Sequence, residues 1–208
     1  MNFSFKVISN KNFMVSDWSG GKTTQLAIAP ADAIYAKQTF DWRISSATVS
    51  VPESTFTALP NYHRILMILE GQLELVHQNH YSKTLMPFDQ DSFLGAWHTS
   101  SYGIVTDFNL MMNPQFTGRL EALHLEANQL TPIDLKDYAP DSDSEILYHL
   151  YAYDFDATVT LDGANINLPK GDLLQVSTRS KAMPRLDILS SNTDGHLIIA
   201  SVAHVQEF

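Results

Sequence analysis

The 208-residue sequence predicts an all-β protein, either a sandwich or a barrel. Short runs rich in β-branched and aromatic residues recur along its whole length, a pattern typical of strands. Only the segment Gly118–Asn128 shows helical periodicity, and its apolar residues fit a helix weakly, so we expect few and short helices. Turn-forming pairs stand between several of the strand-like runs: Glu70-Gly71, Asp162-Gly163 and Lys170-Gly171.

Ten runs are predicted as strands because each is enriched in strand-forming residues and is bounded by turn or loop residues. The run that follows Arg64 is apolar on both faces from Ile65 to Leu69, so we expect it to be buried. In chain order the ten are Phe3–Ile8, Thr23–Ala29, Trp42–Val51, Arg64–Leu69, Gln72–His77, Val105–Met111, Leu147–Tyr153, Thr158–Leu161, Leu173–Ser177 and Leu197–His204.

An acidic, turn-rich stretch, Thr131–Glu145, is predicted to connect two β units. A strand, a Gly-containing turn and a second strand occur on both sides of it, around Glu70-Gly71 and around Asp162-Gly163. A duplicated barrel explains why the same order of strand, turn and strand occurs twice. We therefore expect one unit over residues 1–130 and a second over residues 131–208, packed with strands exchanged so that the chain is one compact unit.

Composition excludes several classes of protein. The formal net charge of −10 argues against binding nucleic acid or an anionic membrane surface, because both require a basic face. The absence of cysteine excludes disulfides and thiolate zinc sites. No stretch approaches the roughly 20 apolar residues of a membrane helix, and the N-terminus lacks the apolar run of a signal peptide. We expect a soluble, cytoplasmic protein.

Two familiar kinds of site are not supported by the spacing of the residues that would form them. The segment Ser19–Thr23 contains Gly-Gly-Lys-Thr, but it lacks the first glycine of a phosphate-binding loop and leads into a strand instead of a helix. Of the eight histidines, no pair shows tight ligand spacing next to a carboxylate, and His77 and His80 flank a turn where exposure is expected. We expect no cofactor and no stoichiometric transition metal.

Two strands combine polar and apolar side chains on one face. Because successive side chains of a strand point to opposite faces, Arg43 and Ser45 share a face, and so do Asp107 and Asn109. If these faces line the inside of a barrel, they form a polar pocket for a small charged molecule. If they face water, they form no site.

Arg64 lies at the start of a buried run, where a guanidinium group is costly without an acceptor. Its planar fork matches a carboxylate, which leaves two alternatives open for Arg43 and Arg64: an internal ion pair, for instance with Asp107 or Glu70, or a clamp for an acidic ligand. The three tryptophans are expected to be core or lid aromatics: Trp18, Trp42 and Trp97.

Four motifs occur in order along the first half of the chain. They are Trp18-Ser19-Gly20-Gly21-Lys22-Thr23, Phe40-Asp41-Trp42-Arg43-Ile44-Ser45 with Ala47 and Val49, His63-Arg64 leading to Leu69-Glu70-Gly71, and Asp107-Phe108-Asn109-Leu110-Met111. The Phe-Asp-Trp-Arg-Ile-Ser and Asp-Phe-Asn-Leu-Met blocks are specific, whereas the Gly-Gly turn alone is weak. Together these motifs, within residues 14–113, resemble the HutD/Ves family.

The resemblance implies a bicupin, two cupin-like (RmlC-like) β-barrels or jelly rolls in one chain, without the histidine-rich metal motif of enzymatic cupins. Where the family tends to show Gly-Pro-Phe-Ser, this chain has Ser54-Thr55-Phe56-Thr57, and Gln25 stands where a glutamate is common. The implied pocket positions are Trp18, Thr23, Gln25, Arg43, Ser45, Arg64, Asp107 and Asn109.

The resemblance also implies a role. Members of the HutD branch accompany histidine-degradation genes and look like regulators that sense a pathway intermediate, and the Ves branch is associated with stress or cold response. We therefore expect a metal-free protein that binds a small, anionic metabolite and acts as a sensor or regulator. Two alternatives stay open: an isomerase or hydrolase acting on a small carboxylic acid with Asp107 or His63 as base, and an interaction protein with a vestigial pocket. A homodimer is compatible with each of these.

Overall fold

The computed structural model describes residues 3–179 and 184–205, and its regular elements are strands and three short 3₁₀ helices. The expected all-β fold with few short helices is thus confirmed, and this part of the chain contains no helix long and apolar enough to cross a membrane. The chain divides into a central unit, residues 13–116, and a terminal unit formed by residues 1–12 and 117–208. The expected division was 1–130 and 131–208; the observed one differs because strands before residue 130 and near the N-terminus pair within the terminal unit.

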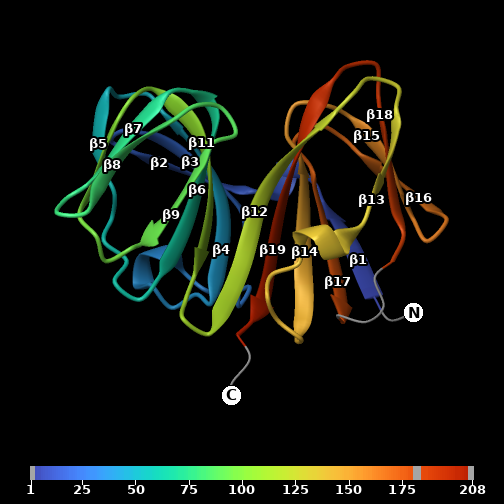
Figure 1. Ribbon diagram of the computed structural model, residues 1–208, viewed down its shortest axis with the longest axis horizontal. Coiled ribbons are helices and arrows are strands. Elements are labelled where there is room, and N and C mark those ends of the chain that lie inside the picture. The colour runs from blue at the N-terminus through green and yellow to red at the C-terminus, as the bar shows by residue number, and fades with distance from the viewer. Residues whose placement is uncertain (1–2, 180–183, 206–208) are drawn as a thin grey trace. The chain divides into compact units, whose positions relative to one another are not determined.

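The central unit contains a six-stranded and a four-stranded sheet (Figure 1). In sheet order, the six strands are β2 (Met14–Trp18), β3 (Gly21–Ala29), β4 (Trp42–Val49), β11 (Val105–Met112), β6 (His63–Gly71) and β9 (Gln90–Leu94). The four strands are β5 (Glu53–Thr55), β10 (Thr99–Tyr102), β7 (Leu73–His77) and β8 (Tyr81–Leu85). A 3₁₀ helix, η2 (Tyr35–Lys37), lies in the connection between β3 and β4.

The terminal unit contains a five-stranded and a four-stranded sheet. The five strands are β1 (Phe3–Ile8), β17 (Leu173–Arg179), β14 (Glu145–Ala152), β19 (Gly195–His204) and β12 (Phe116–Leu125). The four strands are β13 (Leu130–Ile133), β18 (Leu186–Ser190), β15 (Ala157–Leu161) and β16 (Ala164–Leu168), and the 3₁₀ helices are η1 (Asn10–Asn12) and η3 (Leu135–Tyr138).

The two units share one strand order. The central sheets run β4-β11-β6-β9 and β5-β10-β7-β8, and the terminal sheets run β12-β19-β14-β17 and β13-β18-β15-β16. Each terminal strand therefore occupies the place of the central strand eight positions earlier in the chain. The central unit adds β2 and β3 beside β4, and the terminal unit adds β1 beside β17. This repetition supports the duplicated barrel that the repeated strand-turn-strand pattern of the sequence suggested.

Two local predictions were wrong. The segment Gly118–Asn128, the one candidate for a helix on its weak periodicity, lies mostly in strand β12, whose backbone is paired in the five-stranded sheet. Long-range pairing here outweighs a weak local helical pattern. The segment Thr131–Glu145, expected as a connector between the units, lies within the terminal unit, where Ile133 and Leu135 are buried in the core.

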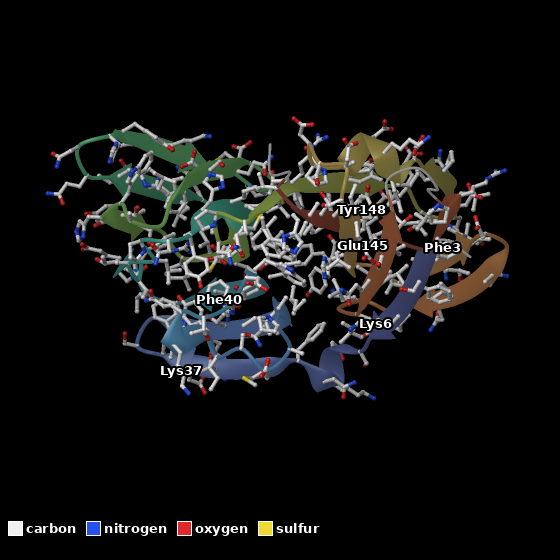
Figure 2. The ribbon with its side chains drawn as sticks, turned by 90° about the horizontal axis from the view of Figure 1, so that it is seen from below. Phe3, Lys6, Lys37, Phe40, Glu145 and Tyr148 are labelled. Carbon is white, nitrogen blue, oxygen red and sulfur yellow. The ribbon has the colours of Figure 1, made fainter. Side chains whose placement is uncertain are left out.

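Clusters of buried apolar residues fill both units. In the terminal unit, one such cluster includes Tyr148 and Phe155. In the central unit, one cluster surrounds Leu66 and Leu75, and a separate one surrounds Phe40. Figure 2 shows Phe40 inside this unit and the exposed Lys37 at its outside. Buried polar side chains also lie inside the central unit, among them Arg43, Arg64 and Asp107, and they form the site described below.

We expect Gly71→Ala to destabilise the protein more than Gly163→Ala. Both glycines lie in predicted turns and have a φ of +84°, in the left-handed region that a Cβ disfavours, so both substitutions share a conformational cost of roughly 1–2 kcal/mol. A Cβ on Gly71 would also lie 2.4 Å from the backbone oxygen of Ile104, whereas nothing lies within 4 Å of a Cβ on Gly163. Urea unfolding of both variants measures the difference; equal losses of stability would contradict the steric argument.

Candidate functional site

The inner face of the six-stranded sheet places two arginines in one row across three strands. Met111 on β11 lies opposite Arg43 on β4 and opposite Arg64 on β6. Side chains that lie opposite one another on antiparallel strands point to the same face. Because neighbouring strands are about 4.8 Å apart, the Cα atoms of the two arginines are roughly 10 Å apart. One face therefore holds two guanidinium groups.

The next rows of the same face carry hydrogen-bonding side chains. Asn109 lies opposite Ser45, and Asp107 lies opposite Ala47. Thr23 on β3 is paired with Ala47 from the other side, which extends this row to a third strand. The period of two that the sequence showed on β4 and β11 thus places these residues together, as expected.

These rows form one wall of a cavity of about 260 Å³. This volume is close to the lower end of the range for ligand pockets, which suits a small molecule. Strand β2, helix η2 and the segment 54–57 supply the remaining wall. The lining residues are Ser16, Trp18, Thr23, Tyr35, Arg43, Ser45, Ala47, Val49, Ser54, Thr55, Phe56, Thr57, Arg64, Asp107, Asn109 and Met111.

Arg43 is held by neutral partners. Its Nε donates to Gln25 Oε1 at 2.9 Å, and its Nη1 donates to Ser45 Oγ at 3.0 Å. The ring of Tyr35 lies against the guanidinium, with Cζ 4.3 Å from the ring centroid. These contacts fix the side chain but cancel none of its charge, because an amide and a hydroxyl are uncharged acceptors.

Arg64 has fewer hydrogen bonds than Arg43. Its Nη2 donates to Asn109 Oδ1 at 2.8 Å, while its buried Nε has no acceptor among the residues that the structure describes. Two aromatic rings cover the guanidinium, with Cζ 4.5 Å from the centroid of Phe56 and 5.4 Å from that of Phe93. The group is thus held by stacking and one neutral acceptor, and it keeps donors for a further partner.

Among the residues that the structure describes, Asp107 is the one carboxylate that lines the cavity, and both groups that donate hydrogen bonds to it are neutral. Its Oδ1 accepts from the Ala47 backbone N–H at 3.2 Å and from Asn109 Nδ2 at 2.7 Å. Within the described chain, neither Arg43 nor Arg64 forms an ion pair with it. The internal ion pair with Asp107, one of the two alternatives for the arginines, is therefore not formed.

Burial dominates the electrostatics of the site. Arg43 and Arg64 are each 5% exposed, and burial lowers the pKa of both guanidinium groups, although nearby Tyr35 and Asp107 oppose this shift. Asp107 is 4% exposed, and burial raises its pKa to about 6 against the opposing effects of Arg64, the Ala47 N–H, Asn109 and Arg43. The cavity thus contains two cations and one weakly acidic carboxyl group.

Seven of the eight predicted pocket residues line this cavity, and the eighth supports it. Gln25 is absent from the lining, but its amide oxygen orients Arg43. Trp18 lines the cavity while remaining 39% exposed, and its ring lies so close to Gly20 that a Cβ there would be 2.0 Å from a ring carbon. Sequence reasoning missed Tyr35 because nothing local distinguishes a loop tyrosine that will stack on a distant arginine. Phe56 was also missed. It lies in the segment 54–57, where the chain departs from the family pattern, and this departure could have indicated its place in the cavity wall.

Of the two histidines expected to be exposed, His80 is exposed and His77 is not. His77, expected to be exposed beside its turn, is 2% exposed, and it bridges Thr99 Oγ1 at 2.8 Å and Asp91 Oδ2 at 2.9 Å. Tyr81 and Lys83 also donate to Asp91, so this network satisfies a buried carboxylate between the sheets. His77 faces inward because it shares the buried face of strand β7 with Leu73 and Leu75.

Neither the histidines nor the acids gather as metal ligands in the residues that are described. No group of three or more His, Asp or Glu side chains there is arranged to hold a metal ion. His63 is half-buried, hydrogen-bonds to Ser92 and does not line the cavity. Since His63 precedes Arg64 on β6, strand alternation directs it to the opposite face.

Comparisons with known proteins agree with the motifs and the architecture. A model of the HutD family matches residues 10–193. A curated relative from Pseudomonas putida, described as an uncharacterized 21.2 kDa protein in the hutC 3′ region, is 33% identical over 87 residues. That match covers 39% of this chain and 45% of the relative, so the chain spans less than half of the relative's length.

Solved structures also resemble the whole chain, among them two from Pseudomonas species. A conserved protein of unknown function from Pseudomonas aeruginosa has a TM-score of 0.76 at 20% identity, covering 96% of this chain and 98% of that one. HutD from Pseudomonas fluorescens, recorded in a formate condition, has a TM-score of 0.69 at 18% identity, covering 98% of this chain and 100% of that one. At these identities the likeness concerns the fold, which is that of a bicupin.

Proposed function

We propose, since the chain belongs to the HutD family, that its central unit binds a small anionic metabolite and acts as a sensor or regulator. One observation carries this proposal: two buried guanidinium groups line one cavity and are hydrogen-bonded to neutral acceptors. A buried charge without a counter-charge is costly, and an anion entering the cavity supplies that counter-charge. The small volume favours a small carboxylic acid over a large anion.

The names of the relatives favour a link with histidine utilisation. One relative is described by its place beside hutC, and one similar structure is called HutD. Gln25 strengthens the preference for an anion in this chain. A glutamate at that position would neutralise Arg43, whereas the amide holds the same nitrogen and leaves the positive charge in the cavity.

An enzyme that acts on a small carboxylic acid is the second candidate. Asp107 favours it, because a carboxyl group with a pKa of about 6 beside two cations can exchange a proton near neutral pH. His63, the other base considered, lies outside the cavity lining, which leaves Asp107 as the one base of the two that faces a bound acid. A regulator needs binding alone, whereas this alternative requires turnover.

A screen of small carboxylates tests the proposal, with formate, acetate, propionate and butyrate set against the matched neutral amides of the same acids. We expect a rise in melting temperature with at least one carboxylate and none with its amide. Stabilisation by a ligand at one hundred times its dissociation constant is about 2.7 kcal/mol, well within detection. Proton NMR of the same mixtures detects conversion of the acid, which would favour the enzyme.

Two outcomes would contradict anion binding in this cavity. One is the absence of any stabilisation by carboxylates at tens of millimolar, which would favour an interaction protein with a vestigial pocket. The other is equal stabilisation by acids and amides, which would show that charge plays no part.

A further inference from the structure

Asp107 has one carboxylate oxygen that the protein satisfies and one that it does not. Oδ1 accepts two hydrogen bonds, from the Ala47 N–H and from Asn109 Nδ2. Oδ2 accepts none from any residue in the described ranges, although the side chain is 4% exposed and lines the cavity. Oδ2 is not enclosed by protein but borders the cavity, so a ligand that displaces solvent there must donate a hydrogen bond to it or leave it unpaired.

The arrangement of Asn109 explains why the arginines do not supply that donor. An arginine can only donate, so the bond from Arg64 Nη2 fixes the amide oxygen of Asn109 toward Arg64 and its nitrogen toward Asp107. Asn109 thereby stands between the two charges. The nitrogens of Arg43 are directed to Gln25 and Ser45. The cavity therefore presents donors from the arginines and, beside them, one acceptor from Asp107.

A simple anion can accept hydrogen bonds from the arginines but cannot donate one to Asp107. Its negative charge meets the arginines, but it also comes close to the Asp107 carboxylate, and it offers Oδ2 no donor. A molecule that carries an O–H or N–H group beside its carboxylate can do both. We infer, building on the proposed anion site, that the ligand is a hydroxy-, amino- or amido-acid whose hydrogen-bond donor is accepted by Asp107 Oδ2.

Matched pairs of acids that differ only in the donor test this inference. N-Acetylglycinate and 4-oxopentanoate have the same shape and charge, with an N–H group in the first replaced by CH₂ in the second. 2-Hydroxypropionate and propionate differ by one hydroxyl. At pH 8, calorimetry with the wild-type protein is expected to show the donor member of at least one pair binding roughly ten- to a hundredfold more tightly.

Asp107→Asn should reverse the preference within the amide pair. The variant keeps an oxygen to accept from Ala47 and Asn109, which directs its new NH₂ group to the place of Oδ2. That group is an uncharged donor. It meets the N–H of N-acetylglycinate with a second donor, so this acid should lose affinity, and it no longer repels the carboxylate of 4-oxopentanoate, which should bind the variant more tightly than it binds the wild type. A folded variant that keeps the wild-type preference would overturn the inference.

A measurement on the wild type alone covers the case in which this variant does not fold. The other titratable groups that line the cavity are one phenol, Tyr35, and two guanidinium groups, Arg43 and Arg64. Protonation of Asp107 at lower pH removes its negative charge and turns its acceptor into a donor. Binding of 4-oxopentanoate should therefore strengthen several-fold from pH 8 to pH 5, while binding of N-acetylglycinate should weaken relative to it.

The outcomes separate this inference from the proposed function. Equal binding of both members of both pairs at pH 8 would overturn the role of Asp107 and leave the anion site intact. Failure of all four acids to bind the wild type at tens of millimolar would overturn both.

Discussion

Replacing Arg43 with alanine is expected to weaken the binding of a small carboxylate by roughly 2–5 kcal/mol, the cost of truncating one member of a buried charge pair. Arg43 lines the cavity and carries a charge that Gln25 and Ser45 do not neutralise. Calorimetric titration of wild type and variant with the tightest carboxylate of the screen measures the loss. Arg64→Ala is expected to have a comparable effect, because Arg64 faces the same cavity.

Two further variants separate charge from shape at this position. Arg43→Lys should recover only part of the affinity, because a lysine keeps the charge but not the planar fork that binds a carboxylate with two hydrogen bonds. Gln25→Glu leaves Arg43 in place and sets a carboxylate on its Nε, so it should weaken binding by neutralisation alone.

The melting temperature of each variant shows whether it is folded. Arg43→Ala removes partners only from neutral groups, so it leaves no buried carboxylate without its hydrogen bonds. We therefore expect a folded protein. Unchanged affinity in that folded variant would show that Arg43 is part of the scaffold and does not contact the ligand.

The second large effect is a dependence of stability on pH that originates at Asp107. Its folded-state pKa is about 6, above the ordinary value of 3.8, so between these values the folded protein binds more protons than the unfolded chain. The corresponding stability is fully present below about pH 4 and is lost as the pH rises through about 6. The total is on the order of 3 kcal/mol. Asp107→Asn removes this slope.

We expect Asp107→Asn to be more stable than the wild type at pH 8 and close to it at pH 4, as measured by urea unfolding across this range. A stability difference that does not change with pH would contradict the raised pKa.

Asp91 provides a control of opposite sign. Burial by itself would raise its pKa, but hydrogen bonds from His77, Tyr81 and Lys83 outweigh burial and lower it. Its contribution to stability is therefore present at neutral pH and lost as the pH falls below its ordinary range. Asp91→Asn should destabilise the protein at pH 8, where Asp107→Asn stabilises it.

The alternation of residues along the strands allowed the site to be predicted. On β4 and β11, a period of two places Arg43 with Ser45 and Asp107 with Asn109, and this property depends on the backbone of each strand alone. The turns at Gly71 and Gly163 were equally local, because a positive φ favours glycine. Such features are visible in the sequence because the residues that decide them are neighbours in the chain.

The predictions that were wrong or missing concern features decided by residues far apart in the sequence. The segment Gly118–Asn128 carries a weak helical pattern, and it became a strand because it pairs with β19, which begins about 70 residues later in the sequence. His77 was expected in water beside a turn, and it is buried because Asp91 and Thr99, from two other strands, meet its ring. The stacking of Tyr35 on Arg43 likewise depends on how a loop closes over the sheet.

The sequence by itself determined that the chain is a β protein of repeated design and which polar residues share a face, because strand periodicity and turn chemistry act between neighbours. Only the tertiary structure decided that the two arginines are hydrogen-bonded to neutral acceptors and that one oxygen of Asp107 has no donor from the protein. These facts depend on the register of β3, β4, β6 and β11, which sets side chains from distant segments within a few ångströms of one another. Hydrogen-bond distances and burial arise from that long-range pairing, and they are what distinguishes an anion site from an internal ion pair.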